Sequence, residues 1–273
     1  MKHHFDSYFL DSPLQGGRVF DVFKPEGIPR DRAIFFIHGG GWSAGSRTVY
    51  YKVMEKLCEM GFICASTDYR LSSPGRNNIH ALDQLKDIRE AYDAFVSLLK
   101  EWNRSLRIVT HGGSAGAHLN ALLSFAAPGA CGEKCELKNE WVKPEKVILQ
   151  ATPMQFEPWA DIFPAVWGEM QNCAAGCSYE SDPEIFRRLS PKNYLNEKSP
   201  VSFFIEAGNE HMFPPEMNFA VVEKMRSMGI DSQWKIYPTA EHGFIYDLSR
   251  RVQQEAFADI VAFLEDRPIV GGR

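Results

Sequence analysis

A serine set between glycines is the residue of this chain whose surroundings most resemble those of a nucleophile. Gly112, Ser114 and Gly116 form the pattern G-x-S-x-G, between a predicted strand at 106–110 and a predicted helix at 114–125. In a nucleophile elbow, a strained turn from strand to helix holds the serine hydroxyl clear of the backbone. Glycines on both sides let the helix pass close to the strand. The pattern indicates nucleophilic catalysis, although a Gly/Ser-rich turn before a helix gives the same pentapeptide.

A serine hydroxyl needs a base to take its proton, and His242 is the candidate. His242 lies in the sequence Glu241-His242-Gly243-Phe244, just after a predicted strand at 233–237. We predict that it removes the proton from Ser114 and later returns it to the leaving group. Taken alone, without the other motifs, His242 is more typical of an ordinary surface histidine than of a catalytic base.

A second glycine-rich segment follows an apolar run. Residues 33–38 predict a strand buried on both faces, and they lead into His38-Gly39-Gly40-Gly41-Trp42. Three successive glycines let bare backbone N–H groups face a ligand. The alternative is a flexible loop without a ligand.

In this order along the chain, the motifs resemble those of the α/β-hydrolases, closest to the hormone-sensitive-lipase-like and the acetyl-esterase or feruloyl-esterase-like carboxylesterases. The resemblance spans about residues 15 to 265, and the matching segments are 38–42, 112–119, 189–194 and 242–244. It implies a carboxylesterase-type serine hydrolase that works through an acyl-enzyme on Ser114. It also implies an oxyanion hole made by the N–H groups of Gly40, Gly41 and Ala115.

The acid that orients His242 departs from the family pattern. Similar esterases carry G-x-x-D after the strand predicted here at 201–207, and counting from Gly208 puts His211 at the aspartate position. Glu210 is one residue earlier, and hydrolases of this fold accept glutamate as well as aspartate. We therefore predict Glu210 as the triad acid, with Asp247 as the second candidate.

The segment at 152–196 breaks the alternation of strands and helices and is rich in proline and aromatic residues. We interpret it as an insertion over the active site, either a small cap or a pocket lining, with a packed loop at the sheet edge as the alternative. The predicted substrate-binding residues are Trp42, Phe244, Trp159 and Trp167.

The chemical groups need a scaffold, and the hydrophobic pattern predicts a single α/β domain over 1–273. We expect a mostly parallel sheet of about eight strands with helices on both faces. Residues 1–17 are polar and predict no element. The predicted strands lie at 18–24, 33–38, 62–67, 106–110, 146–151, 201–207 and 233–237, with 18–24 at the edge. The predicted helices lie at 48–60, 79–102, 114–125, 215–228 and 250–265.

Composition narrows the partners. The chain has 273 residues, 44% hydrophobic and 24% charged residues and a net charge of -5, which argues against nucleic acid and anionic membranes. With no apolar signal core at its start, the chain is expected to be cytoplasmic. We expect no cofactor and no metal. Cys58 and Cys64 read as core residues; Cys131, Cys135, Cys173 and Cys177 read first as thiols, then as disulfides, then as a zinc site.

The expected partner is a small-molecule ester with a short acyl chain or an aryl group. Sugar-linked acetyl or feruloyl esters are implied by the resemblance alone. Two alternatives stay open: an amidase such as an arylformamidase with the same triad, and a ligand-binding protein without activity on the hydrolase fold. A homodimer also stays open.

Overall fold

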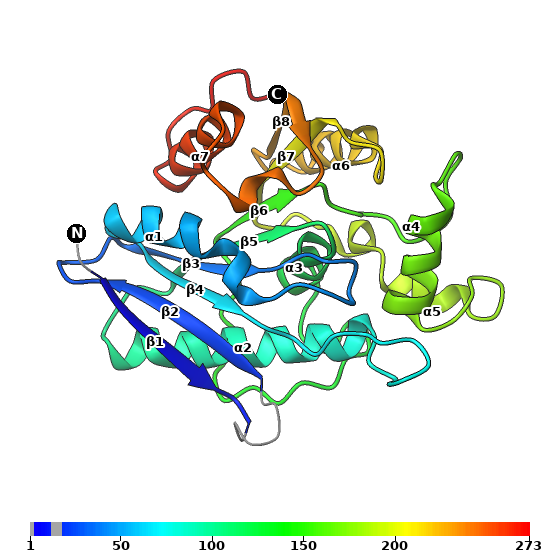
Figure 1. The fold of residues 1–273 in the computed structure, drawn as a ribbon, viewed down its shortest axis with the longest axis horizontal. Coiled ribbons are helices and arrows are strands. Elements are labelled where there is room, and N and C mark those ends of the chain that lie inside the picture. The colour runs from blue at the N-terminus through cyan, green and yellow to red at the C-terminus, as the bar shows by residue number, and fades with distance from the viewer. Residues whose placement is uncertain (1–2, 12–17) are drawn as a thin grey trace.

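The computed structural model describes residues 3–11 and 18–273, and its central feature is one eight-stranded sheet (Figure 1). The strand order is β1-β2-β4-β3-β5-β6-β7-β8. β1 and β2 pair antiparallel to their neighbours, while all pairs from β4 to β8 are parallel. The strands are β1 (His3–Phe9), β2 (Val19–Pro25), β3 (Arg32–Ile37), β4 (Ile63–Thr67), β5 (Arg107–Gly113), β6 (Lys146–Gln150), β7 (Val201–Asn209) and β8 (Gln233–Glu241).

Helices cover both faces of this sheet because its central strands are apolar on both sides. In β3, Ile34 and Phe36 pack toward α1 (Tyr51–Glu59) and α7 (Arg251–Leu264). Phe35 and Ile37 point to the other face, where α2 (Ala81–Glu101) and α3 (Ala115–Phe125) pack. On that face α3 also packs with α6 (Pro215–Ser227), beside β6 and β7. Such alternation of side chains places each strand in two cores at once.

The mostly parallel α/β sheet of about eight strands is therefore confirmed, and so are the seven predicted strands and five predicted helices, to within a few residues at their ends. The N-terminal prediction was wrong in one respect. Residues 3–9 form β1, so β2 is the second strand and not the edge. β1 is mostly exposed and lacks a buried apolar face, which is why its pattern carried no strand signal. Gly16 and Gly17, at the end of the polar segment, lie outside the described residues.

The segment at 152–196 folds into short helices instead of a strand–helix unit. They are α4 (Pro164–Glu169), the π-helix η3 (Met170–Ala175), α5 (Pro183–Arg188) and the 3-10 turn η4 (Pro191–Tyr194). The Trp167 ring packs at a tilt against Phe186 and Tyr179. Val166 and Met170 belong to the same hydrophobic core as the buried face of α2. Helices α4 and α5 lie on the side of the molecule away from β1 and β2 (Figure 1).

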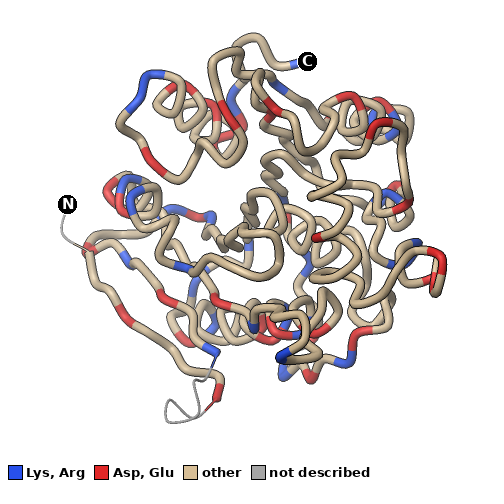
Figure 2. Tube along the Cα trace, turned by 45° about the vertical axis from the view of Figure 1, so that its right-hand side comes forward, with Lys and Arg blue, Asp and Glu red and all other residues tan. Residues whose placement is uncertain are grey.

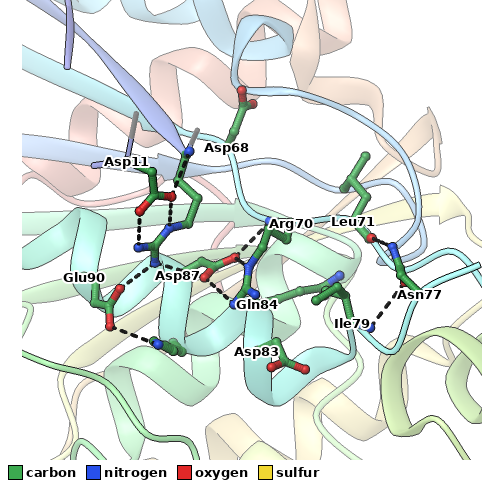
Figure 3. Close-up of polar contacts among 12 residues, drawn as sticks. Asp11, Asp68, Arg70, Leu71, Asn77, Ile79, Asp83, Gln84, Asp87 and Glu90 are labelled. Atoms are coloured by element: carbon green, nitrogen blue, oxygen red, sulfur yellow. Dashed lines mark hydrogen bonds and ion pairs between the residues drawn. The ribbon is translucent and has the colours of Figure 1, made fainter. Parts of the chain in front are cut away.

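Charged residues of both signs are interspersed around the outside of the chain (Figure 2), and one ionic cluster ties the N-terminal strands to α2. Asp87, whose side chain is fully buried, accepts hydrogen bonds from Arg18 at 3.0 Å and from Arg70 at 2.8 Å and 2.9 Å. Arg18 also binds Asp11 and Glu90. Figure 3 labels these two acids together with Asp87 and Arg70. This cluster fixes the loop after β4 against α2 on the face opposite α1.

A buried ion pair holds the end of α3. Arg89 of α2 and Glu133 are both fully buried, with 2.6 Å between Nε and Oε1. The Arg89 guanidinium also donates to the carbonyls of Leu122, Leu123 and Ala126, which lie at the carboxyl end of α3. The pair satisfies helix carbonyls that have no partner within the helix.

We expect Glu133→Ala to lower the free energy of unfolding by about 3–5 kcal/mol, because it leaves the Arg89 charge buried without its partner. Urea unfolding monitored by circular dichroism measures the change. The control is Glu255→Ala, which removes the exposed pair with Arg251 and should cost at most about 0.5 kcal/mol. Equal losses in the two variants would contradict this account of the buried pair.

Candidate active site

The turn between β5 and α3 is a strained elbow that only glycines permit on either side of Ser114. Ser114 has φ 55° and ψ -124°, in a region that side-chain-bearing residues rarely adopt. A Cβ at Gly112 would lie 2.4 Å from the carbonyl oxygen of Gly116, and a Cβ at Gly116 would lie 2.3 Å from the carbonyls of Ile37 and His38. The helix therefore starts directly against the end of β3, with the serine at the turn.

The structure brings Ser114, His242 and Glu210 into one hydrogen-bonded row. His242 Nε2 lies 2.8 Å from Ser114 Oγ, and His242 Nδ1 lies 2.7 Å from Glu210 Oε2. A carboxylate accepts only, so Nδ1 carries the proton and Nε2 is left to accept from the serine hydroxyl. This is the tautomer that a general base requires.

Both carboxylate oxygens of Glu210 accept hydrogen bonds, one from His242 and the other from the backbone. Its side chain is fully buried, and Oε1 accepts from the backbone N–H groups of His211 at 3.0 Å and Met212 at 2.8 Å. Burial pushes the pKa of Glu210 upward, but the hydrogen bond and charge of His242 and the two backbone donors outweigh it, leaving the pKa below its ordinary value. Glu210 is therefore ionised at neutral pH.

Neither Asp247, the second candidate acid, nor His211, at the aspartate position of the family pattern, binds His242. Asp247, although only five residues further on, binds Lys52 Nζ at 3.0 Å and Ser249 Oγ at 2.7 Å, and its side chain is 39% exposed. His211 is exposed, and its Nδ1 lies 3.2 Å from the carbonyl oxygen of Asn209. Of the two acids considered from the sequence, the fold brings only Glu210 to the histidine.

The glycine loop passes directly over the elbow. Gly40 has φ 125° and Gly41 has φ 56°, both values that favour glycine. A Cβ at Gly39 would lie 2.5 Å from the carbonyl oxygen of Gly113 and 3.2 Å from the Cβ of Ser114. Ala115 is the first residue of α3, where a backbone N–H has no partner within the helix. Gly39 of this loop thus lies against the elbow, and Ala115 directly follows the serine in the chain.

Two aromatic residues brace this loop from beneath. The His38 ring stacks on Tyr69 with 4.2 Å between centroids, and Tyr69 donates from its hydroxyl to the His38 carbonyl at 2.8 Å. The Tyr246 hydroxyl oxygen lies 2.7 Å from the position that a Cβ on Gly39 would take and 2.9 Å from that of a Cβ on Gly113. No motif pointed to Tyr246, because its position depends on the η5 turn (Phe244–Tyr246) after His242.

Two of the four predicted substrate-binding residues are core residues instead. Trp42 is 1% exposed, its indole N–H donates to His118 Nδ1 at 3.2 Å, and its ring packs edge-on against Phe156. Phe244 is 3% exposed and packs on Tyr237 in the core beneath α7. Their positions next to the motifs suggested the pocket, but the chain turns both side chains inward. We assign neither a contact with substrate.

The two tryptophans of segment 152–196 have different surroundings. Trp159 lines a cavity of about 410 Å³, together with Glu210 and Phe213, whereas Trp167 packs on Tyr179 and Phe186. The Phe213 ring lies 6.1 Å from the His242 ring, centroid to centroid. Neither Ser114 nor His242 lines this cavity. Its wall is formed by Trp159, Asp161, Phe163, Ala207, Gly208, Glu210, His211, Met212, Phe213, Pro214, Pro215, Glu216 and Ile236.

All six cysteines are thiols in the structure, and Cys58 and Cys64 are buried as expected. Within residues 3–11 and 18–273, no group of three or more His, Cys, Asp or Glu side chains is arranged to hold a metal ion. The same residues contain no helix both long and apolar enough to cross a membrane.

Comparisons with known proteins identify a matching family and related esterases. The family model BD-FAE matches residues 20–225. The chain is 25% identical to Esterase LipQ of Mycobacterium tuberculosis, over 90% of this chain and 59% of LipQ, and 25% identical to an acetylxylan esterase of Xylanibacter ruminicola, over 90% and 48%. It thus spans between about half and three fifths of the length of these relatives.

A solved structure of Thermogutta terrifontis esterase 2, phosphonylated by sarin, has a TM-score of 0.73 and 21% identity to this chain, covering 91% of it and 90% of the esterase. The likeness extends over nearly the whole of both chains. It confirms the α/β-hydrolase fold predicted from the motifs.

A buried histidine of β5, near the elbow, makes the free energy of unfolding depend on pH. His111 of β5 is fully buried against Phe36 and Tyr50, and neither ring nitrogen has a hydrogen-bond partner among the described residues. Burial lowers its pKa to about 3. Between that value and the unfolded pKa of about 6.5, the unfolded chain binds one proton that the folded chain does not. Stability from this site is therefore complete above pH 6.5 and falls as the pH falls.

We expect His111→Phe to reduce the slope of unfolding free energy against pH by about 1.4 kcal/mol per pH unit, between about pH 5.5 and pH 4. Urea unfolding at a series of pH values measures the slope. The exposed His211→Gln serves as the control and should leave the slope unchanged. An unaltered slope in His111→Phe would show that His111 is protonated in the folded protein.

Proposed function

The chain belongs to the BD-FAE family, and from this premise we propose that it is a serine carboxylester hydrolase whose nucleophile is Ser114. The observation that carries the proposal is the row of two hydrogen bonds, Ser114 to His242 at 2.8 Å and His242 to Glu210 at 2.7 Å. A serine activated by a correctly oriented imidazole attacks acyl carbons. The names of the relatives, an esterase and an acetylxylan esterase, support an ester as the substrate.

In the proposed acylation step, His242 Nε2 takes the proton of Ser114 as Oγ bonds to the ester carbonyl carbon. The carbonyl oxygen becomes an oxyanion and accepts hydrogen bonds from the N–H groups of Gly40, Gly41 and Ala115. When the tetrahedral intermediate collapses, the carbon–alkoxy bond breaks and His242 gives its proton to the leaving alcohol. Water then repeats the sequence on the acyl-enzyme and releases the acid.

Glu210 acts on this reaction through His242. Its carboxylate fixes the Nδ1–H tautomer and stabilises the imidazolium that forms in each step. The two backbone N–H groups on its other oxygen keep the charge in place while the proton moves. The low pKa of Glu210 matches this role, because the residue must stay ionised.

We propose that residues 152–196 act as a small cap on a single α/β-hydrolase domain over 1–273, and that the substrate is a small-molecule ester. Support for the cap comes from its short helices and from Trp159 at the cavity beside Glu210. An ester with a short acyl chain, including a sugar-linked acetyl group, fits the acetylxylan esterase among the relatives.

We expect Ser114→Ala to lower kcat/KM for p-nitrophenyl acetate by at least about 10³-fold, since the variant has no group to form the acyl-enzyme. A p-nitrophenyl series from acetate to octanoate measures both the rate and the chain-length limit. Ser181→Ala, which changes an exposed serine of the insertion, is the matched control. Retained rates in a folded Ser114→Ala protein would contradict the mechanism. Without turnover of any ester by the wild type, an amide substrate or a binding role would replace the proposal.

We expect Glu210→Gln to lower kcat by about 10³- to 10⁴-fold, because a neutral amide neither selects the Nδ1–H tautomer nor stabilises the imidazolium. Asp247→Asn, which removes a charge paired with Lys52 at the surface, should change kcat by less than about threefold. Steady-state kinetics on p-nitrophenyl acetate compare the two. The opposite order would move the triad acid to Asp247.

A further inference from the structure

Glu169 extends from the insertion onto the glycine loop. A Cβ on Gly41 would lie 2.8 Å from Glu169 Oε2 and 3.2 Å from its carboxyl carbon, so the carboxylate rests on the α-carbon of Gly41. Glu169 is the last residue of α4 and directly precedes the π-helix η3. Its neighbours Val166 and Met170 are buried in the core and anchor this turn. A π-helix in such a position is typical of functional sites.

The carboxylate has no partner within the part of the chain that the structure describes. It receives no hydrogen bond and forms no ion pair, and its residue is exposed. Partial burial of its carboxyl group raises the pKa of Glu169, and the charge of His242 lowers it, so the two groups lie close enough to interact electrostatically. A charge left unpaired at the mouth of a site is available to a ligand.

An ionised carboxylate in this position disfavours formation of the proposed oxyanion when no hydrogen-bond donor is bound to it. Negative charge develops on the substrate carbonyl oxygen next to Gly41, and a second negative charge nearby raises the energy of that state. A hydroxyl or ammonium group of the substrate that donates to the carboxylate offsets this effect, since hydrogen bonds to charged acceptors are the strong ones. An anionic substrate adds a further negative charge and raises the energy of the oxyanion state more.

We propose that Glu169 is a specificity-determining residue: it accepts a hydrogen bond from a hydroxyl or ammonium group of the ester substrate and discriminates against anionic esters. The inference rests on the proposed esterase function and adds the chemical class of the substrate. It assigns to the insertion a polar contact that the aromatic pattern of 152–196 did not suggest.

The test compares kcat/KM at pH 7 by pH-stat for esters that differ in one group. The alcohol series is propyl acetate, 2-hydroxyethyl acetate, protonated 2-(dimethylamino)ethyl acetate and the acetoxyacetate anion; the acyl pair is ethyl propionate and ethyl glycolate. The variants are Glu169→Gln, which removes the charge but keeps an acceptor, and Glu169→Ala, which removes both. Glu180→Gln, an exposed carboxylate of the same insertion, is the matched control.

We expect the wild type to have a higher kcat/KM for an ester that carries a hydroxyl or ammonium group than for the matched ester without one. We expect this ratio of kcat/KM values to fall about 10-fold or more in Glu169→Ala. In Glu169→Gln the preference for the ammonium ester falls by a similar factor, because the negative charge is gone. The preference for the hydroxyl ester falls less, because the amide oxygen still accepts a hydrogen bond. The variant therefore distinguishes the two kinds of donor. Turnover of acetoxyacetate and of propyl acetate rises in both variants, an increase that misfolding cannot produce.

Ratios within about twofold of wild type in both variants, with Ser114-dependent turnover of p-nitrophenyl acetate intact, would overturn the role of Glu169 and leave the esterase proposal standing. A Glu180→Gln variant that shifted the ratios as strongly would also overturn it. If the Ser114→Ala variant turned over p-nitrophenyl acetate as fast as the wild type, the proposed function would be overturned instead, and the role of Glu169 with it.

Discussion

The candidate site depends on a close approach between two backbone segments. The first turn of α3 passes so near the end of β3 that Gly116 leaves no room for a side chain against the Ile37 and His38 carbonyls. The same contact brings the glycine loop over Gly113 and Ser114. Because Ser114, the start of α3 and Gly39 of the loop all lie at this contact, one steric constraint positions the nucleophile and the loop that we propose to supply oxyanion donors.

A second approach, between β7 and β8, brings acid and base together. The register of these strands shifts between Ala207 and Asn209, and a Cβ on Gly208 would lie 2.4 Å from the carbonyl oxygen of Pro238. The irregularity turns the chain so that Glu210 points at His242 while His211 points to solvent. Glu210, one residue before the aspartate position of similar esterases, thus still reaches His242.

Sequence alone predicted the features that follow from strong local patterns. The buried strands have apolar runs, the elbow and the glycine loop have glycines in the order typical of the resembled family, and Glu210 followed from its place one residue before the aspartate position. β1 was missed because an exposed edge strand needs no apolar face. Trp42 and Phe244 were misplaced, since the direction of a side chain in a loop depends on tertiary packing. Glu169 gave no signal, because its meaning lies in a contact with a residue 128 positions earlier.

The central claim is that His242 activates Ser114, and covalent labelling tests it most directly. A fluorophosphonate reacts with a serine only when a base removes its proton. Intact-protein and peptide mass spectrometry should find one adduct per chain, on Ser114, and the adduct should be lost in His242→Ala although the variant remains folded. Labelling of another residue, or equal labelling of Ser114 without His242, would contradict the account.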